Sequence, residues 1–129
     1  MLQPLARILV IDDNDDVRAV ILAVLESAGH EVVLASDGAR GIELQRKSPA
    51  DLVITDILMP DNEGIETIRD LKQEFPPVRI IAMSGAAKPL TATDFLITAK
   101  ALGAHAVLRK PFEASALLKS VEATLNLPN

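Results

Sequence analysis

Polar side chains that bind metal ions or phosphate follow four of the short apolar runs in this 129-residue sequence. Asp12 and Asp13 follow one run and Asp56 another, whereas Ser84 follows a third and Lys110 comes after a fourth. If the folded chain brings these three carboxylates together, a cation is expected among them, because two unit charges ~4 Å apart repel by about 4 kcal/mol at a protein-like dielectric. With oxygen ligands and no Cys or His nearby, the fitting ion is Mg²⁺. Lys110 would add a fixed positive charge and Ser84 a hydroxyl donor, so the set predicts phosphoryl transfer to Asp56.

Each of these residues also has a simpler explanation when it is taken alone. Asp12-Asp13 is typical of helix capping, and a lone Asp56 after a strand is typical of a turn. Ser84-Gly85 is usual in loops, and Lys110-Pro111 alone says little. Their joint occurrence, each after a different apolar run and in this chain order, favours the phosphoryl-transfer interpretation.

The elements that must position these side chains alternate along the chain. Short aliphatic and β-branched runs predict strands over 7–11, 31–35, 51–55, 78–83 and 104–108. Helical periodicity predicts helices over 14–28, 39–47, 64–75, 92–102 and 113–126. Most of the strand runs are apolar on both faces, as in a parallel sheet covered on each side. The pattern indicates an α/β fold with a doubly wound five-stranded parallel sheet of flavodoxin-like (βα)5 type. In strand order 2-1-3-4-5, the first and third strands are neighbours where the order reverses, so the three carboxylates would meet there.

Several motifs make the chain resemble the receiver domain of two-component response regulators over essentially its whole length. The motifs are Ile8-Leu-Val-Ile-Asp-Asp13, Thr55-Asp-Ile-Leu-Met-Pro60 with Gly64, Ala82-Met-Ser-Gly85 and Leu108-Arg-Lys-Pro-Phe112. The resemblance implies that Asp13 and Asp56 bind Mg²⁺ together with the backbone carbonyl of Leu58, and that Asp12 supports the metal through water. It also implies that Asp56 accepts a phosphoryl group from a histidine kinase.

The same resemblance assigns roles near the end of the chain. Ser84 looks like the hydroxyl that moves on phosphorylation, and Lys110 like the partner of the phosphoryl group. Lys110-Pro111 is expected to be a cis peptide. In this family a Tyr or Phe usually lies three residues before the lysine, but here the residue is Val107. The aromatic part of the usual switch is therefore missing.

The stretch from Ser84 to Gly103 is a few residues longer than usual for this family, and the extra residues are expected within 86–91. If the 92–102 helix turns Phe95, Leu96, Ala99 and Leu102 to the sheet, then Ile97 and Ala101 point elsewhere. With Val107 they would form an exposed patch for a partner. The alternative is a helix that is merely rotated or more buried.

Composition excludes several classes of protein. The net charge is −5, from 13 Lys and Arg against 18 Asp and Glu, and the only aromatic residues are three Phe, so a nucleic-acid footprint is not expected. The absence of Cys excludes disulfides and thiolate metal sites. No apolar run approaches the ~20 residues of a membrane span. The N-terminus lacks a secretory signal pattern, so a cytoplasmic protein is predicted.

The residues and the resemblance together predict a phosphorylation-dependent signalling switch in a two-component or phosphorelay system. Residues 1–129 would form a single receiver domain whose fourth helix, fifth strand and fifth helix change partner binding. The predicted partners are a histidine kinase or histidine phosphotransfer protein, and downstream a protein or a second receiver copy in a homodimer. Such a domain catalyses only its own phosphorylation and dephosphorylation and is not a turnover enzyme.

Two functions from other classes remain open at this point. A phosphate-independent interaction module of receiver-like fold is favoured by Val107 and disfavoured by the complete set of polar residues. A Mg²⁺-dependent phosphohydrolase would need a dedicated general acid/base and a substrate pocket. A nucleotide-binding role is weaker still, because no Gly-rich loop follows the first strand.

Overall fold

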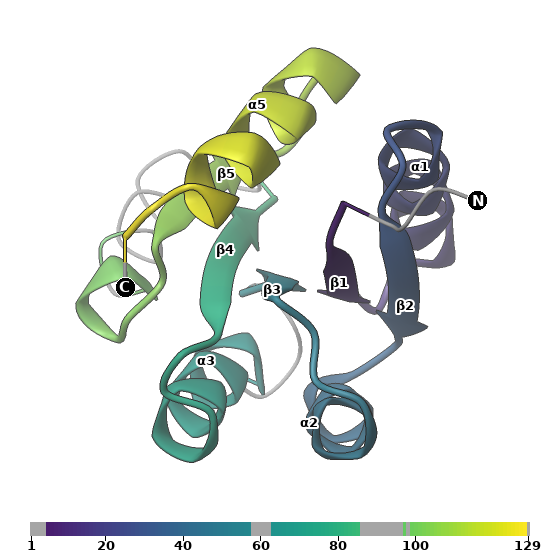
Figure 1. Ribbon diagram of the computed structural model, residues 1–129. Helices are drawn as coiled ribbons and strands as arrows, with labels where there is room; N and C mark the ends of the chain where they lie inside the picture. The colour runs from purple at the N-terminus through teal and green to yellow at the C-terminus, as the bar shows by residue number, and fades with distance from the viewer. Residues whose placement is uncertain (1–4, 58–62, 86–96, 98, 129) are drawn as a thin grey trace.

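The structure is a computed structural model and describes residues 5–57, 63–85, 97 and 99–128. Strands and helices alternate from residue 7 to residue 84 (Figure 1). The strands are β1 (Arg7–Ile11), β2 (Glu31–Ala35), β3 (Leu52–Asp56), β4 (Arg79–Ser84) and β5 (Ala106–Arg109). The helices are α1 (Asp15–Ser27), α2 (Gly38–Lys47), α3 (Glu63–Glu74) and α5 (Ala114–Leu125).

All five strands are parallel and lie in the order β2-β1-β3-β4-β5, which confirms the predicted topology. Ile11 of β1 pairs with Thr55 of β3, so the next residues on these neighbouring strands are Asp12 and Asp56. Ser84 is the last residue of β4, the strand on the other side of β3. The sheet register therefore brings the polar strand ends to one edge.

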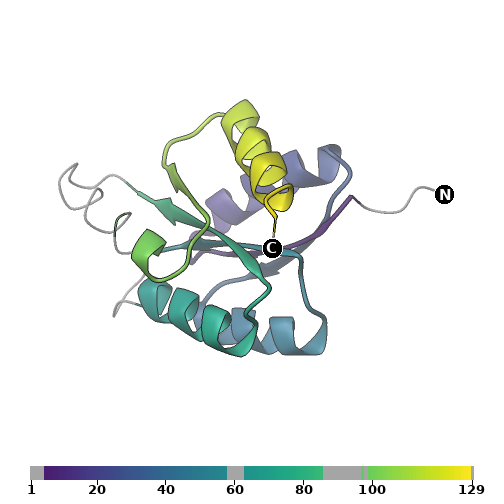
Figure 2. The same ribbon diagram turned by 60° about the vertical axis from the view of Figure 1, so that its left-hand side comes forward.

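Helices cover both faces of the sheet, with α1 and α5 on one face and α2 and α3 on the other (Figure 1). Figure 2 shows the same layers from another side. Because side chains alternate along a strand, Ile8 and Val10 of β1 pack with α1 and α5, whereas Leu9 and Ile11 pack with the opposite layer. β1 and β3 are buried on both faces, and their ends carry Asp12 and Asp56.

The later strands lie one or two residues nearer the C-terminus than the sequence predicted. β3 includes Asp56, and β5 begins at Ala106 rather than at residue 104. The reason is pairing: the backbone N–H of Ala104 donates to the carbonyl of Ala99 (3.0 Å) and so belongs to the turn before the strand. α1 begins at Asp15, one residue after the predicted start, because Asn14 caps the helix: its side chain accepts a hydrogen bond from the Val17 N–H (3.0 Å).

The predicted helix over 92–102 lies largely outside the described residues. Within it, Ile97 and Ala99 are helical; Ile97 is 65% exposed and Ala99 is fully buried. Lys110-Pro111 is a cis peptide, as the resemblance implied. Among the described residues, none of the helices has the length and apolar character needed to cross a membrane.

Candidate functional site

Three carboxylates meet at the carboxyl edge of the sheet. Asp12 and Asp13 follow β1 and Asp56 ends β3, and one oxygen from each lies within 4.8 Å of the others. Asp12 is fully buried and Asp56 is 5% exposed, whereas Asp13 is exposed to solvent. A cluster that is buried on one side and open on the other suits a ligand that arrives from solvent.

Lys110, just beyond β5, bridges the two buried carboxylates. Its Nζ lies 2.6 Å from Asp12 Oδ2 and 2.9 Å from Asp56 Oδ2. Burial of the ammonium lowers the pKa of Lys110, but hydrogen bonds to Asp12 and Asp56, and the charges of these groups, outweigh burial and raise the pKa above its usual value. Lys110 is therefore positively charged at neutral pH. Its backbone N–H donates to the carbonyl of Ser84 (2.8 Å), which joins β4 to this loop.

The donor set fits a hard divalent cation. Three carboxylates against the single ammonium of Lys110 leave two formal negative charges, and all the donors are oxygens. Both Asp12 oxygens already accept hydrogen bonds, Oδ1 from the Asn14 N–H (2.9 Å) and Oδ2 from Lys110. Asp12 is therefore poorly placed to bind an ion directly.

The remaining predicted site residues have different outcomes. Ser84 is almost completely buried, and its Oγ lies 3.4 Å from the Gly85 carbonyl oxygen, so the hydroxyl is held at the end of β4. Leu58, whose backbone carbonyl was predicted as a ligand, lies outside the described residues. Because Ser84 and Asp56 end adjacent strands, the hydroxyl lies on the same edge as the carboxylates.

Gly64 fixes the backbone of the central aspartate. A Cβ atom on Gly64 would lie 2.3 Å from the Asp56 carbonyl oxygen and 2.4 Å from Ile57 Cα. The first turn of α3 therefore packs directly on the end of β3, as only glycine allows here. Sequence reasoning noted Gly64 as part of a motif without this steric reason.

Sequence reasoning missed Arg18. This residue of α1 reaches back to the site: its Nη1 donates to the Asp12 carbonyl oxygen, and its Nη2 pairs with Asp15. In the sequence, Arg18 looks like an ordinary solvent-facing helix residue. A signal was present, because a basic residue one turn inside a helix can return to the preceding loop.

A comparison with known families identifies the chain. The model of the response regulator receiver domain matches residues 8–122. The chain belongs to this family. Receiver domains are signalling switches that histidine kinases phosphorylate, and they generally bind Mg²⁺.

Related receiver domains occur both alone and within longer proteins. Chemotaxis protein CheY of Bacillus subtilis is 36% identical over 121 residues, which are 93% of this chain and 98% of CheY. Protein PilH of Pseudomonas aeruginosa is 34% identical, over 94% of this chain and 98% of PilH. The DNA-binding transcriptional regulator NtrC of Azospirillum brasilense is 36% identical, but this receiver domain spans only 24% of its length.

Solved structures have the same fold. The receiver domain of NtrX from Brucella abortus superposes with a TM-score of 0.87 at 26% identity, covering 94% of this chain and 99% of that chain. A response regulator receiver domain protein from Clostridium thermocellum superposes with a TM-score of 0.85 at 34% identity, covering 95% of both chains. The flavodoxin-like fold is thus shown by strand order and by superposition.

This receiver domain has an aliphatic residue where the family usually has an aromatic one. Val107 lies in β5, pairs with Ala82 of β4, and packs its half-buried side chain against the core on the α2 and α3 face. An isopropyl group has no ring that can turn between a buried and an exposed position.

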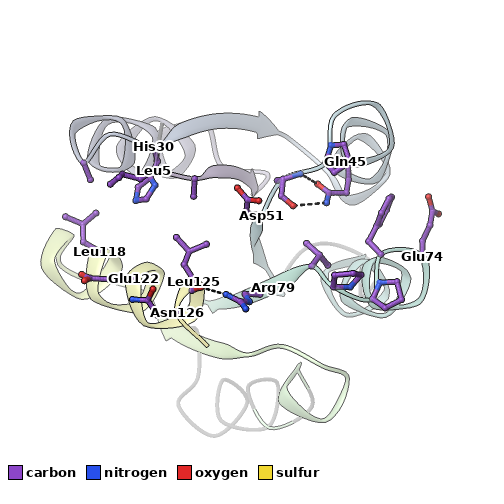
Figure 3. Close-up of a pocket in the computed structure, with 18 residues that line it drawn as sticks. Leu5, His30, Gln45, Asp51, Glu74, Arg79, Leu118, Glu122, Leu125 and Asn126 are labelled. Atoms are coloured by element: carbon purple, nitrogen blue, oxygen red, sulfur yellow. Dashed lines mark hydrogen bonds between the residues drawn. The ribbon is translucent and has the colours of Figure 1, made fainter. Parts of the chain in front are cut away.

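A groove of about 1160 Å³ lies at the opposite, amino-terminal edge of the receiver domain (Figure 3). Its lining includes Leu5 of the N-terminal segment and Leu118 and Leu125 of α5. It contains none of the carboxylates or the lysine described above. Convergent unbalanced charge is instead found at the carboxyl edge, which makes that edge the candidate site.

Proposed function

We propose that this receiver domain is a phosphorylation-dependent switch in which Asp56 accepts a phosphoryl group from a phosphohistidine. The donor would be a histidine kinase or a histidine phosphotransfer protein, and the reaction would require Mg²⁺. The observation that carries the proposal is the Lys110 ammonium, which bridges Asp12 and Asp56 beside the exposed Asp13. This arrangement leaves excess negative charge beside a fixed cation.

Each side chain has a defined part in the proposed transfer. A carboxylate oxygen of Asp56 attacks phosphorus, the P–N bond of the donor breaks, and its electron pair goes to the imidazole nitrogen, which takes up a proton. Asp13 and Asp56 would hold Mg²⁺, and Asp12 would support it through water. When bound, the ion supplies positive charge that offsets the charge of the transferring group. Lys110 offers its ammonium to the phosphoryl oxygens, which add three acceptors to Asp56.

The switch follows from contacts that only the phosphorylated form makes. Ser84 and Lys110 would each donate a charge-assisted hydrogen bond to the phosphoryl group, together worth about 3 to 6 kcal/mol. Reversing a 1:99 equilibrium needs about 5.5 kcal/mol. The switch is thus feasible with little surplus, and Val107 favours a graded response. The responding surface would include β5, α5 and the segment between β4 and β5.

The proposal also covers the extent, location and partners of the switch. Residues 1–129 act as one receiver domain in the cytoplasm, with a downstream protein or a second receiver copy as the output partner. Neither nucleic acid nor membrane binds directly to this domain. Its chemistry is limited to its own phosphorylation and dephosphorylation.

The proposal is tested by incubating the protein with Mg²⁺ and acetyl phosphate and measuring intact mass. We expect a gain of one phosphoryl group, which is lost in Asp56→Asn and in the presence of EDTA. Asp51→Asn is the matched control, because Asp51 is an exposed carboxylate just before β3, at the opposite edge. An unchanged mass for the wild type, or equal labelling of Asp56→Asn, contradicts the proposal.

Val107 favours a second candidate, a receiver-like module that binds its partner independently of phosphate. The two functions differ in whether phosphorylation alters the surface. Hydrogen exchange of β5 and α5 is measured with and without Mg²⁺ and beryllofluoride, a phosphoryl mimic. Changed protection in these elements supports the switch, whereas identical protection supports the module.

A further inference from the structure

Arg18 contacts the backbone of the site rather than its carboxylates. The residue lies in the second turn of α1, and its Nη1 donates to the carbonyl oxygen of Asp12 (2.5 Å). Its Nη2 pairs with the carboxylate of Asp15 one turn earlier. The Arg18 side chain is only 15% exposed, so the guanidinium is mostly withdrawn from solvent.

The carbonyl that Arg18 holds belongs to the peptide unit joining Asp12 to Asp13. A peptide unit is planar, so fixing its carbonyl direction also fixes the direction of the bond into Asp13. On the other side of Asp13, the Asn14 N–H donates to Asp12 Oδ1 (2.9 Å). The exposed Asp13 is therefore held by hydrogen bonds to both peptide units that flank it, and only one of these bonds comes from outside the loop.

The partner of the second guanidinium nitrogen contributes little by itself. The Asp15 side chain is 88% exposed, and solvent-exposed ion pairs at this helical spacing are weak. A planar guanidinium can nevertheless hold two oxygens at once in fixed directions. Asp15 thus orients the guanidinium of Arg18, and the contact that matters for the site is the hydrogen bond from Arg18 to the Asp12 carbonyl oxygen.

We infer that Arg18 is a positioning residue that holds the Asp12–Asp13 peptide so that the Asp13 carboxylate points at the cation. The inference rests on the proposed function, because it assumes that Asp13 and Asp56 bind Mg²⁺. Residues that orient metal ligands without touching the metal typically change metal affinity 10- to 100-fold when replaced.

A positioning role and a simple charge effect predict opposite changes in Mg²⁺ affinity when Arg18 is replaced. Removing a positive charge near an anionic cluster strengthens the attraction of the cluster for Mg²⁺. Removing the hydrogen bond that orients Asp13 weakens binding. The sign of the change in Mg²⁺ affinity therefore separates a positioning role from a bystander charge, and a purely structural role would leave the affinity of the folded protein unchanged.

The test is a calorimetric titration of the full chain with Mg²⁺ alone. We expect Arg18→Met to weaken Mg²⁺ binding about tenfold. The control is Arg46→Met, which also removes one positive charge and an ion pair, between Arg46 and Glu74 near the ends of α2 and α3. Its Mg²⁺ affinity should match the wild type. Circular dichroism establishes that each variant is folded.

Arg18→Lys provides a second measurement that does not depend on folding of the methionine variant. It keeps the charge but loses the planar fork, so Mg²⁺ binding should also weaken. An affinity equal to or higher than that of the wild type, in either folded variant, overturns the inference. Failure of the wild type to bind Mg²⁺ would instead contradict the proposed function, so the two failures are distinct.

Discussion

The two edges of the sheet use charge in opposite ways. At the carboxyl edge, Lys110 faces more carboxylate charge than it neutralises, and Asp12 and Asp56 are nonetheless buried. At the amino edge, charges are matched to partners: Arg7 pairs with Glu31 (3.1 Å), and Arg79 donates to backbone carbonyls at the end of α5. A groove lies at the matched edge, whereas the candidate site lies at the unmatched one.

The amino edge also uses polar groups to complete the sheet. The Asp51 carboxylate accepts from the Arg7 N–H (2.9 Å), and the His105 Nδ1 accepts from the Ile80 N–H (3.2 Å). Side chains here replace missing ladder hydrogen bonds. The comparison teaches that paired charge supports the fold at one edge, whereas an excess of negative charge lies at the edge where we propose that a ligand binds.

The largest expected effect is from Lys110→Met, which leaves two buried carboxylates without their cation. Without Mg²⁺, we expect the free energy of unfolding to fall by about 3 kcal/mol, measured by urea denaturation in EDTA. The control is Lys47→Met, since Lys47 is 67% exposed and makes only a surface pair, worth under about 0.5 kcal/mol. Equal stability of Lys110→Met and the wild type would mean that the carboxyl edge is not held by this charge.

Arg79→Met probes the matched edge. Arg79 donates to the carbonyls of Thr124 (3.3 Å), Leu125 and Leu127, so its loss should lower the free energy of unfolding by about 2 kcal/mol. Mg²⁺ affinity, measured by calorimetry, should not change. A weakened Mg²⁺ affinity in this variant would show that the two edges are coupled and would break the comparison.

Asp13→Asn should have the opposite effect on stability. Removing one of three carboxylates that approach within 4.8 Å relieves repulsion. We expect a gain of about 1 kcal/mol in the absence of divalent cations, small because solvent screens the exposed Asp13. The same variant should lose Mg²⁺ binding in calorimetry. Loss of stability together with unchanged Mg²⁺ binding would contradict the excess of negative charge inferred here.

The smallest expected effect is a pH dependence of the free energy of unfolding. It arises from two histidines, His30 just before β2 and His105 just before β5. Burial lowers the pKa of His30, and burial together with the charges of Lys72 and Arg79 lowers the pKa of His105. As the pH falls below about 6.5, the histidines of the unfolded chain bind protons before those of the folded protein do. The free energy of unfolding therefore declines as the pH falls below about 6.5, and these histidines leave it unchanged at higher pH.

This dependence is measured from the urea midpoint between about pH 7.5 and about pH 5.5. The double variant His30→Asn/His105→Asn should show a smaller decline, because Asn cannot titrate but places an acceptor oxygen near the position of Nδ1. If the decline is as steep in the double variant, the histidines do not cause it.

Much of the fold followed from local pattern. The alternation of apolar runs predicted five parallel strands in a doubly wound sheet, and Asn14 predicted the start of α1, because capping and burial on both faces depend on nearby residues. The boundaries of β3 and β5 shifted, since pairing between strands decides where a ladder ends. Arg18 was missed, because its contact with Asp12 depends on how α1 leaves the loop.

The sequence alone determined which groups are present: three carboxylates, a hydroxyl and a lysine at the ends of the first, third, fourth and fifth strands, and a valine in place of the family's aromatic residue. Only the tertiary structure decided which of these side chains contact one another. Lys110 is 98 residues from Asp12 and 54 from Asp56, yet one ammonium bridges both, because parallel strands bring their carboxyl ends to one edge. Side chains that are remote in sequence acquire their partners only when the sheet sets their distance and burial.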